Sequence, residues 1–297
     1  MNDSRKSKPA SRRYESPGFC IYCFKTPPEV KLTDEHIWPE SLYGYDLLLG
    51  ASCQSCAAIL SKVDGYLARH VYYDLRLRCG FRSKRKNKKK HPTQAETKFL
   101  RNGIPESVIT PVEDKAFSVA LPKFQPPGIL RGNRAESHFG HMAIEGHNFI
   151  EELFKHVKVE PNDIIEVPVF NIIDPIKFAK GIAKIAYCTA VSFWGVNRYS
   201  GCIIPSILLG ECDYLPYVVG SPNEPTPAYV DSDALHHQWV YATQRDGIIY
   251  LVVRLRPFAT YGSHNGGNPI GFPIYDVVIG EISEQQAREG PRPRQIA

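Results

Sequence analysis

Apolar residues recur at helical spacing in the stretch that ends near His70. Between Cys53 and Val71 they fall three or four residues apart, which places them along one side of an α-helix. The stripe consists of Ala57, Leu60, Val63, Leu67 and Val71. The pattern predicts a helix over 53–70 that packs this stripe on a neighbouring element and carries Asp64 on its polar side.

A second helix is expected from Asp174 to Trp194. Asp174 can accept hydrogen bonds from the first turn, and Pro175 suits the first helical position because its ring already has a helical φ. One face of this helix carries three lysines, Lys177, Lys180 and Lys184. The opposite face carries the apolar residues Ile182, Ile185 and Ala186. Three lysines on one face predict a solvated surface, with a nucleic-acid contact as the alternative.

The other patterned segments are mostly strand-like. Strands are predicted at 30–38, within 107–121, and at 164–170, 238–242, 247–255 and 274–282. Two of them should form a hairpin across Asp246-Gly247, a favoured turn dipeptide. Residues 136–158 are predicted to form a helix that carries Phe149, Ile150, Leu153 and Phe154. Helices and strands are therefore mixed, and the fold class is α+β.

Composition and charge divide the chain. Residues 1–91 hold 18 Lys and Arg against 9 Asp and Glu, a net charge of +9, whereas the remainder holds 18 against 22, a net charge of −4. We expect a disordered basic tail (1–17), a small first domain (18–81), a basic linker or arm (82–98), a larger α+β domain (99–283) and a frayed tail (284–297). The histidines His236 and His237 lack ligand spacing, which favours a surface or packing role.

The linker contains the densest charge. Seven of the ten residues 82–91 are Lys or Arg, namely Arg82, Lys84, Arg85, Lys86, Lys88, Lys89 and Lys90. Such a run cannot form a core, so it should be exposed and able to contact the phosphates of DNA, with RNA not excluded. A solvated linker is the alternative.

Four of the eight cysteines are paired as Cys20-x-x-Cys23 and Cys53-x-x-Cys56. Each spacer lets a turn present two thiolates to one ion, and four thiolates complete the tetrahedral shell of a structural Zn²⁺. The N-terminus lacks the apolar core of a signal peptide, and no apolar run is long enough for a membrane helix. We expect a cytoplasmic protein that does not bind membranes. In the reducing cytoplasm, paired thiols bind metal rather than form disulfides. The unpaired cysteines Cys79, Cys188, Cys202 and Cys212 should be small core residues.

The two cysteine pairs bracket the sequence Asp34-Glu35-His36. Two carboxylates beside an imidazole are the groups that can hold a divalent cation and take a proton from water. Neighbouring side chains on a strand point to opposite faces, so Glu35 and His36 can serve one site only if the backbone bends there or Asp34 shares the ligand role.

The motif Glu35-His-Ile-x-Pro-x-Ser-Leu-x-Gly44, set between the cysteine pairs, resembles zinc-bearing HNH endonucleases of the ββα-metal fold. The resemblance covers about residues 18–90. It implies that His36 is the general base that activates water, and that Glu35 helps to bind a catalytic Mg²⁺ or other divalent cation. A further ligand should come from the following helix; Asp64 is preferred because hard cations favour carboxylates, and His70 is the alternative.

The sequence departs from the family pattern in two places. No asparagine occurs between His36 and Asn87, so Asp46 or Ser52 would have to fix the loop, and Ala57 stands where the family often has asparagine. The predicted function is a metal-dependent endonuclease acting on DNA, and the resemblance implies a setting in phage defence or a mobile element. The alternative is a zinc ribbon that binds nucleic acid without cutting it. The first domain should cut with little sequence preference by itself, and the second would supply target choice.

Overall fold

The structure is a computed structural model, and it describes residues 11–81, 92–133, 135–167, 172–228, 234–265, 268–291 and 295–296. The basic run with the predicted phosphate contacts (Arg82, Lys84, Arg85, Lys86, Lys88, Lys89 and Lys90) lies outside these residues, as do residues 1–10 of the predicted tail.

The first third of the described chain forms a hairpin followed by a helix. Strand β2 (Leu32–His36) pairs antiparallel with β3 (Leu47–Cys53), and α1 (Gln54–Tyr66) begins directly after β3. The helix continues into a π-helical turn (Leu67–Val71) and then α2 (Tyr73–Arg78). The hairpin and the helix expected over 53–70 are confirmed.

Both ends of the chain add strands to this hairpin. Strand β1 (Arg13–Tyr14) runs parallel to β3, and β15 (Gln295–Ile296) pairs with β1, which gives the sheet order β15-β1-β3-β2. The side chain of Tyr14 is buried. Within the segment predicted as a disordered tail, residues 13–14 are therefore part of a sheet.

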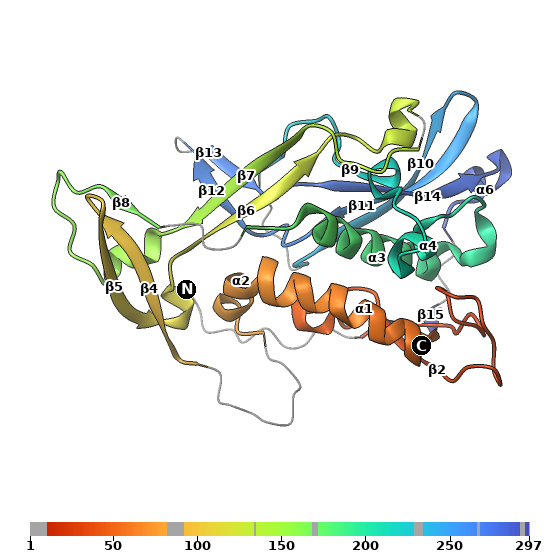
Figure 1. The fold of residues 1–297 in the computed structure, drawn as a ribbon, viewed down its shortest axis with the longest axis horizontal. Coiled ribbons are helices and arrows are strands. Elements are labelled where there is room, and N and C mark those ends of the chain that lie inside the picture. The colour runs from red at the N-terminus through yellow and green to blue at the C-terminus, as the bar shows by residue number, and fades with distance from the viewer. Residues whose placement is uncertain are drawn as a thin grey trace.

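Helix α3 (Pro175–Trp194) is the central element of the molecule. Asp174 accepts hydrogen bonds from the backbone N–H groups of Ile176 and Lys177, which confirms the predicted cap. Figure 1 shows α3 between α1 on one side and strands β11 and β14 on the other. A Cβ at Gly181 would lie 2.6 Å from Leu67 Cδ1, so the absence of a side chain there allows the close approach of α3 to the helix that follows α1.

A four-stranded sheet, in the order β10-β11-β14-β9, covers α3. The predicted hairpin is confirmed as β10 (His237–Arg245) and β11 (Ile248–Arg256), and the last predicted strand is β14 (Tyr275–Ile282). Short helices α4 (Ile204–Leu209) and α5 (Leu215–Val218) lead into β9 (Val219–Gly220). A further hairpin joins β12 (Gly262–Asn265) to β13 (Asn268–Gly271).

Two further sheets lie toward the opposite end of the molecule from α6 (Figure 1). One has the order β5-β4-β8, with strands β4 (Gln94–Arg101), β5 (Ile104–Pro111) and β8 (Ile165–Glu166). The other pairs β6 (Phe117–Phe124) with β7 (Met142–Phe149). The first has its own small core around Phe99, Ala116 and Leu153. Strand β4 starts inside the segment predicted to be a linker.

Two predictions about local structure are wrong. Residues 136–158 form β7 and a short 3-10 helix (Glu151–Lys155), because the β7 segment pairs along its whole length with β6 and alternates buried and exposed side chains near Phe149. Residues 284–289 form α6 (Glu284–Glu289) instead of a frayed tail, because Ser283 and Gln286 cap its first turn reciprocally.

The main core runs through the whole chain. One cluster of buried apolar side chains extends from Tyr14 to Ile282 and includes residues of α1, α3 and the β10-β11-β14-β9 sheet. The domain division at 82–98 stays a prediction, and the first part shares its core with the second. None of the described helices is both long enough and apolar enough to cross a membrane.

Candidate metal centre and active site

The four paired cysteines converge at one end of the hairpin. Cys20 and Cys23 lie in a tight turn closed by a hydrogen bond from the Phe24 N–H to the Cys20 carbonyl, whereas Cys53 ends β3 and Cys56 lies in the first turn of α1. Their sulfur atoms all lie within 4.8 Å of one another. The turn, the strand end and the helix start are thus brought together at one point.

This cluster fits a zinc ion. Four Zn–S bonds of about 2.3 Å in a tetrahedron place sulfur atoms about 3.8 Å apart, and the Cys23 and Cys53 sulfurs are 3.7 Å apart. All four cysteines are free thiols. Within the described part of the chain, this is the one group of three or more His, Cys, Asp or Glu side chains placed to share a metal ion.

Local hydrogen bonds fix the loop between the cysteine pairs. Asp34 accepts from the Gly50 N–H at 2.9 Å, and Thr33 donates to the Ser52 carbonyl, so both tie β2 to β3. Asp46 pairs with Arg12 at 2.6 Å, and its backbone carbonyl accepts from the Ile37 N–H. The side chain of Asp46, one of the two proposed replacements for the missing asparagine, thus ties the end of the loop to Arg12.

Position 44 must be glycine because there is no space for a side chain. A Cβ there would lie 2.0 Å from the Trp38 carbonyl oxygen, closer than two non-bonded atoms can approach. The last residue of the motif is thus required by the backbone packing of the loop that follows His36.

Glu35 and Asp64, the two predicted ligands of a catalytic cation, come together around a lysine. The Lys184 ammonium lies 2.7 Å from Glu35 Oε1 and 3.2 Å from Asp64 Oδ2. It also donates to the backbone carbonyl of His36 at 2.8 Å. Lys184 comes from α3, far from the motif in sequence, and its side chain is fully buried. The prediction that Lys184 belongs to a solvated face is wrong.

The charges in this cluster affect the pKa values of Lys184 and Asp64. Burial by itself would lower the pKa of Lys184, but the negative charges of Asp64 and Glu35 outweigh burial and raise the pKa above its ordinary value. Burial raises the pKa of Asp64, and the charge of Lys184 opposes that rise. The lysine is therefore charged at neutral pH, held by the two carboxylates.

His36 ends β2 with a partly exposed side chain, directly after the buried Glu35. A break in the β2–β3 register falls between Thr33 and Glu35. His70, the alternative ligand on the following helix, is exposed and stacks on Tyr66 with the ring centres 5.3 Å apart. Of the two candidates, Asp64 is thus the one that joins Glu35.

Lys184 is the residue that sequence reasoning missed, although a signal was present. The helix around it is apolar on nearly every side, from Phe178 to Val191, and a helix that is apolar all round is buried. A lysine within such a helix must meet a carboxylate in the interior. The spacing of the three lysines concealed this, because Lys177 is indeed exposed.

A second contact joins the motif loop to the C-terminal sheet. The Trp38 ring stacks on His236 at 4.1 Å between ring centres, and its Nε1–H donates to Gln238 at 2.8 Å. His236 Nδ1 accepts from the Phe258 N–H, so Nε2 carries the proton and donates to the Leu42 carbonyl at 2.7 Å. The packing role predicted as one option for His236 agrees with this geometry.

An open cleft of about 590 Å³ lies beside this contact. Its walls carry several aromatic side chains and one charged pair: Trp38, Tyr43, Tyr45, Phe193, His237, Trp239, Arg12 and Asp46. Trp239 remains 44% exposed. The motif loop and the C-terminal half both line the cleft.

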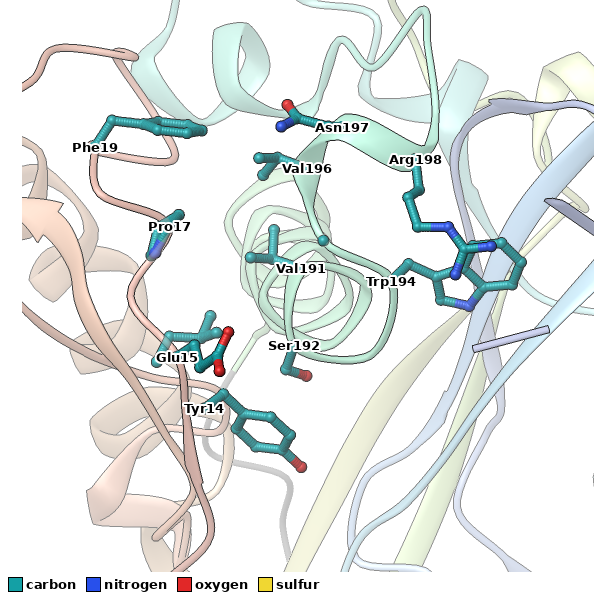
Figure 2. Close-up of a pocket in the computed structure, with 12 residues that line it drawn as sticks. Tyr14, Glu15, Pro17, Phe19, Val191, Ser192, Trp194, Val196, Asn197 and Arg198 are labelled. Carbon is teal, nitrogen blue, oxygen red and sulfur yellow. The ribbon is translucent and has the colours of Figure 1, made fainter. Parts of the chain in front are cut away.

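A smaller cavity of about 50 Å³ lies at the C-terminal end of α3. Figure 2 shows Tyr14, Glu15 and Pro17 on one side of it and the end of α3, from Val191 onward, on the other. None of the predicted site residues lines this cavity, which is too small for a nucleotide.

Comparison with known proteins identifies the N-terminal part. Residues 20–72 match the HNH endonuclease family. The matched segment runs from the first cysteine of the cluster to the residue after the π-helical turn, and it is called the HNH region below. No curated protein and no solved structure matches the chain. The match supports a nuclease-type function for this region, and its four thiols are compatible with structural zinc.

The catalytic divalent cation that the family implies does not fit the Glu35 and Asp64 pair as the chain is folded. Mg²⁺ needs oxygen ligands at about 2.1 Å on most sides, and Lys184 already donates to one oxygen of each carboxylate. A second cation at these oxygens would be repelled by the ammonium.

Proposed function

We propose that the protein is an endonuclease of the HNH type that hydrolyses phosphodiester bonds in DNA. The observation that carries the proposal is the HNH region itself, residues 20–72, whose motif and folded hairpin and helix agree with the family. The net charge of +9 over residues 1–91 favours a polyanionic substrate, RNA included.

His36 is the proposed general base. Its imidazole is partly exposed at the end of β2, where a water molecule can reach it. A neutral imidazole nitrogen can accept a proton from water as the water attacks phosphorus. No step of the reaction is assigned to a cation bound by Glu35 and Asp64.

The aromatic cleft offers a second reason to expect nucleic acid. Successive bases stack on aromatic rings regardless of sequence, each worth about 1–3 kcal/mol. Tyr43, Tyr45 and Trp239 line the cleft, which adjoins Trp38, two residues after His36. An unpaired stretch of DNA bound there would lie next to the motif loop.

Two observations favour a second candidate function, DNA binding without cleavage. Lys184 occupies one oxygen of each carboxylate that would hold the metal, and Ala57 stands where the family often has asparagine. A protein of this kind would keep the zinc-supported frame and the basic charge and would lack turnover.

Plasmid nicking distinguishes the two functions. Zinc-loaded wild type, His36→Ala and His70→Ala are incubated with supercoiled plasmid and Mg²⁺ or Mn²⁺, and binding is followed on the same DNA by mobility shift. We expect nicking by wild type and by His70→Ala, which changes an exposed histidine stacked on Tyr66, and a loss of at least 100-fold for His36→Ala, in the range that general-base catalysis contributes. Binding without nicking by wild type supports the second candidate, and equal nicking by His36→Ala removes the proposed base.

A further inference from the structure

The ammonium of Lys184 has a complete set of partners. An ammonium has three donors, and Lys184 uses them on Glu35 Oε1, Asp64 Oδ2 and the His36 carbonyl at 2.7, 3.2 and 2.8 Å. The three acceptors come from β2 and α1, and the donor comes from α3. The lysine is thus the cation on which the two elements of the HNH region converge.

The surroundings leave Lys184 no route to solvent. Its side chain is fully buried, and residues on both sides of it in α3 are buried as well, among them Ile182, Ile185 and Cys188. Cys188, one helical turn further, contacts the Tyr22 hydroxyl at 3.2 Å within the HNH region. The ammonium is thus held within the interface between α3 and the HNH region.

We infer that Lys184 takes the place of the divalent cation between Glu35 and Asp64, so that this pair binds neither Mg²⁺ nor Mn²⁺ in the folded chain. An ion bound to Glu35 Oε1 at about 2.1 Å could lie no more than about 5 Å from the ammonium, since Nζ is 2.7 Å from the same oxygen. Burial strengthens the repulsion between the two cations.

Lys184 already takes one oxygen of each carboxylate. Asp64 Oδ1 is buried and accepts no hydrogen bond within the described part of the chain, while Oδ2 already serves Lys184. An ion at the remaining carboxylate oxygens would share the interior with the ammonium, whose charge opposes its binding. The C-terminal half of the chain thereby supplies, through one side chain, the positive charge of the site.

The first test is metal binding by the full-length, zinc-loaded protein. Mn²⁺ is titrated and the free ion is followed by electron paramagnetic resonance, with a thermal melt at each concentration. We expect wild type and Asp64→Asn to give the same titration and the same unshifted melting temperature at millimolar Mn²⁺. Asp64→Asn keeps the Glu35–Lys184 pair. Saturable Mn²⁺ binding by wild type that Asp64→Asn abolishes would overturn the inference.

The second test removes the lysine. Lys184→Met leaves two carboxylates in the interior without a cation, so it should melt below wild type, and Mn²⁺ should raise its melting temperature. Glu35→Gln/Lys184→Met removes one carboxylate too, so it should melt above the single variant and respond less to Mn²⁺. A Lys184→Met protein as stable as wild type and indifferent to Mn²⁺ would show that the lysine does not stand in for an ion. If the single variant does not fold, the wild-type titration decides.

The inference about Lys184 rests on the proposed function only for the choice of ion. Its failure can therefore be told apart from failure of the proposed function. Nicking by wild type together with Mn²⁺ binding that depends on Asp64 would keep the endonuclease and refute the role of Lys184. Absence of nicking together with absence of Mn²⁺ binding would refute the endonuclease and keep the role of Lys184.

Discussion

At the scale of single residues, His236 shows how one side chain can join distant parts of the chain. It packs on Trp38 and donates to Leu42 in the motif loop, while it accepts from Phe258 in the C-terminal half. These contacts hold the His236 imidazole in its neutral form, because protonation of Nδ1 would remove the acceptor for the Phe258 N–H. Burial lowers the pKa of His236 to about 4.

Stability should therefore fall as the pH decreases through the range from 6.5 to 4. The folded state binds fewer protons than the unfolded state in this window, so the contribution of His236 is fully present above pH 6.5 and is lost toward pH 4. We expect a loss on the order of 2 kcal/mol. Burial also lowers the pKa of His147 to about 4, so the measurement is the difference between wild type and His236→Gln in urea melts at several pH values. Parallel curves for the two proteins would contradict the assignment.

At the scale of elements, the thiol cluster holds three pieces of the HNH region in place. The Cys20–Cys23 turn meets the end of β3 and the start of α1 at the sulfur atoms. In small metal-supported units the binding energy of zinc supplies much of the folding energy. The hairpin that carries Glu35 and His36 should thus depend on the ion.

Cys53→Ser tests this dependence. We expect the variant to lose most of its zinc and to melt at a clearly lower temperature, since three thiolates and a hydroxyl bind Zn²⁺ far more weakly than four thiolates. Zinc content by atomic spectroscopy and thermal melts measure the two effects. Cys212→Ser changes a cysteine outside the cluster and should keep its zinc. A stable wild-type protein purified without zinc would rule out the structural ion.

At the scale of the whole molecule, α3 joins the two halves. It buries Lys184 against Glu35 and Asp64, and its Tyr187 hydroxyl donates to the Ile21 carbonyl at 2.7 Å. One apolar core extends across residues on both sides of the basic run. Cutting by the first part alone, which its motif and charge suggested, stays a prediction; the shared core predicts that this part needs α3 to fold.

A fragment ending at residue 98 should accordingly fold poorly even with saturating zinc. Without α3, the fragment exposes apolar side chains that the full chain buries, such as Ile21, Leu60 and Leu67. We expect a low and broad thermal transition and strong binding of a hydrophobic dye. Addition of the fragment 99–297 in trans should reduce the dye signal. A sharp transition and no dye binding would instead support an independent first domain.

The sequence by itself determined the elements whose cause is local. The spacing of cysteines indicated the zinc cluster, the apolar stripe indicated α1, and Asp174 with Pro175 set the start of α3, because each depends on residues within a few turns of one another. The segment 142–149 escaped prediction because its partner strand, β6, decides its conformation.

Only the tertiary structure decided which charges face one another. Glu35 and Asp64 could be paired in advance by their place in the motif and helix, but the cation between them is supplied by Lys184, more than a hundred residues away. Periodicity assigns a lysine to a face of its helix and does not say what covers that face. The energy of a buried charge depends on its partners in space, and those partners were fixed by the packing of α3 on α1.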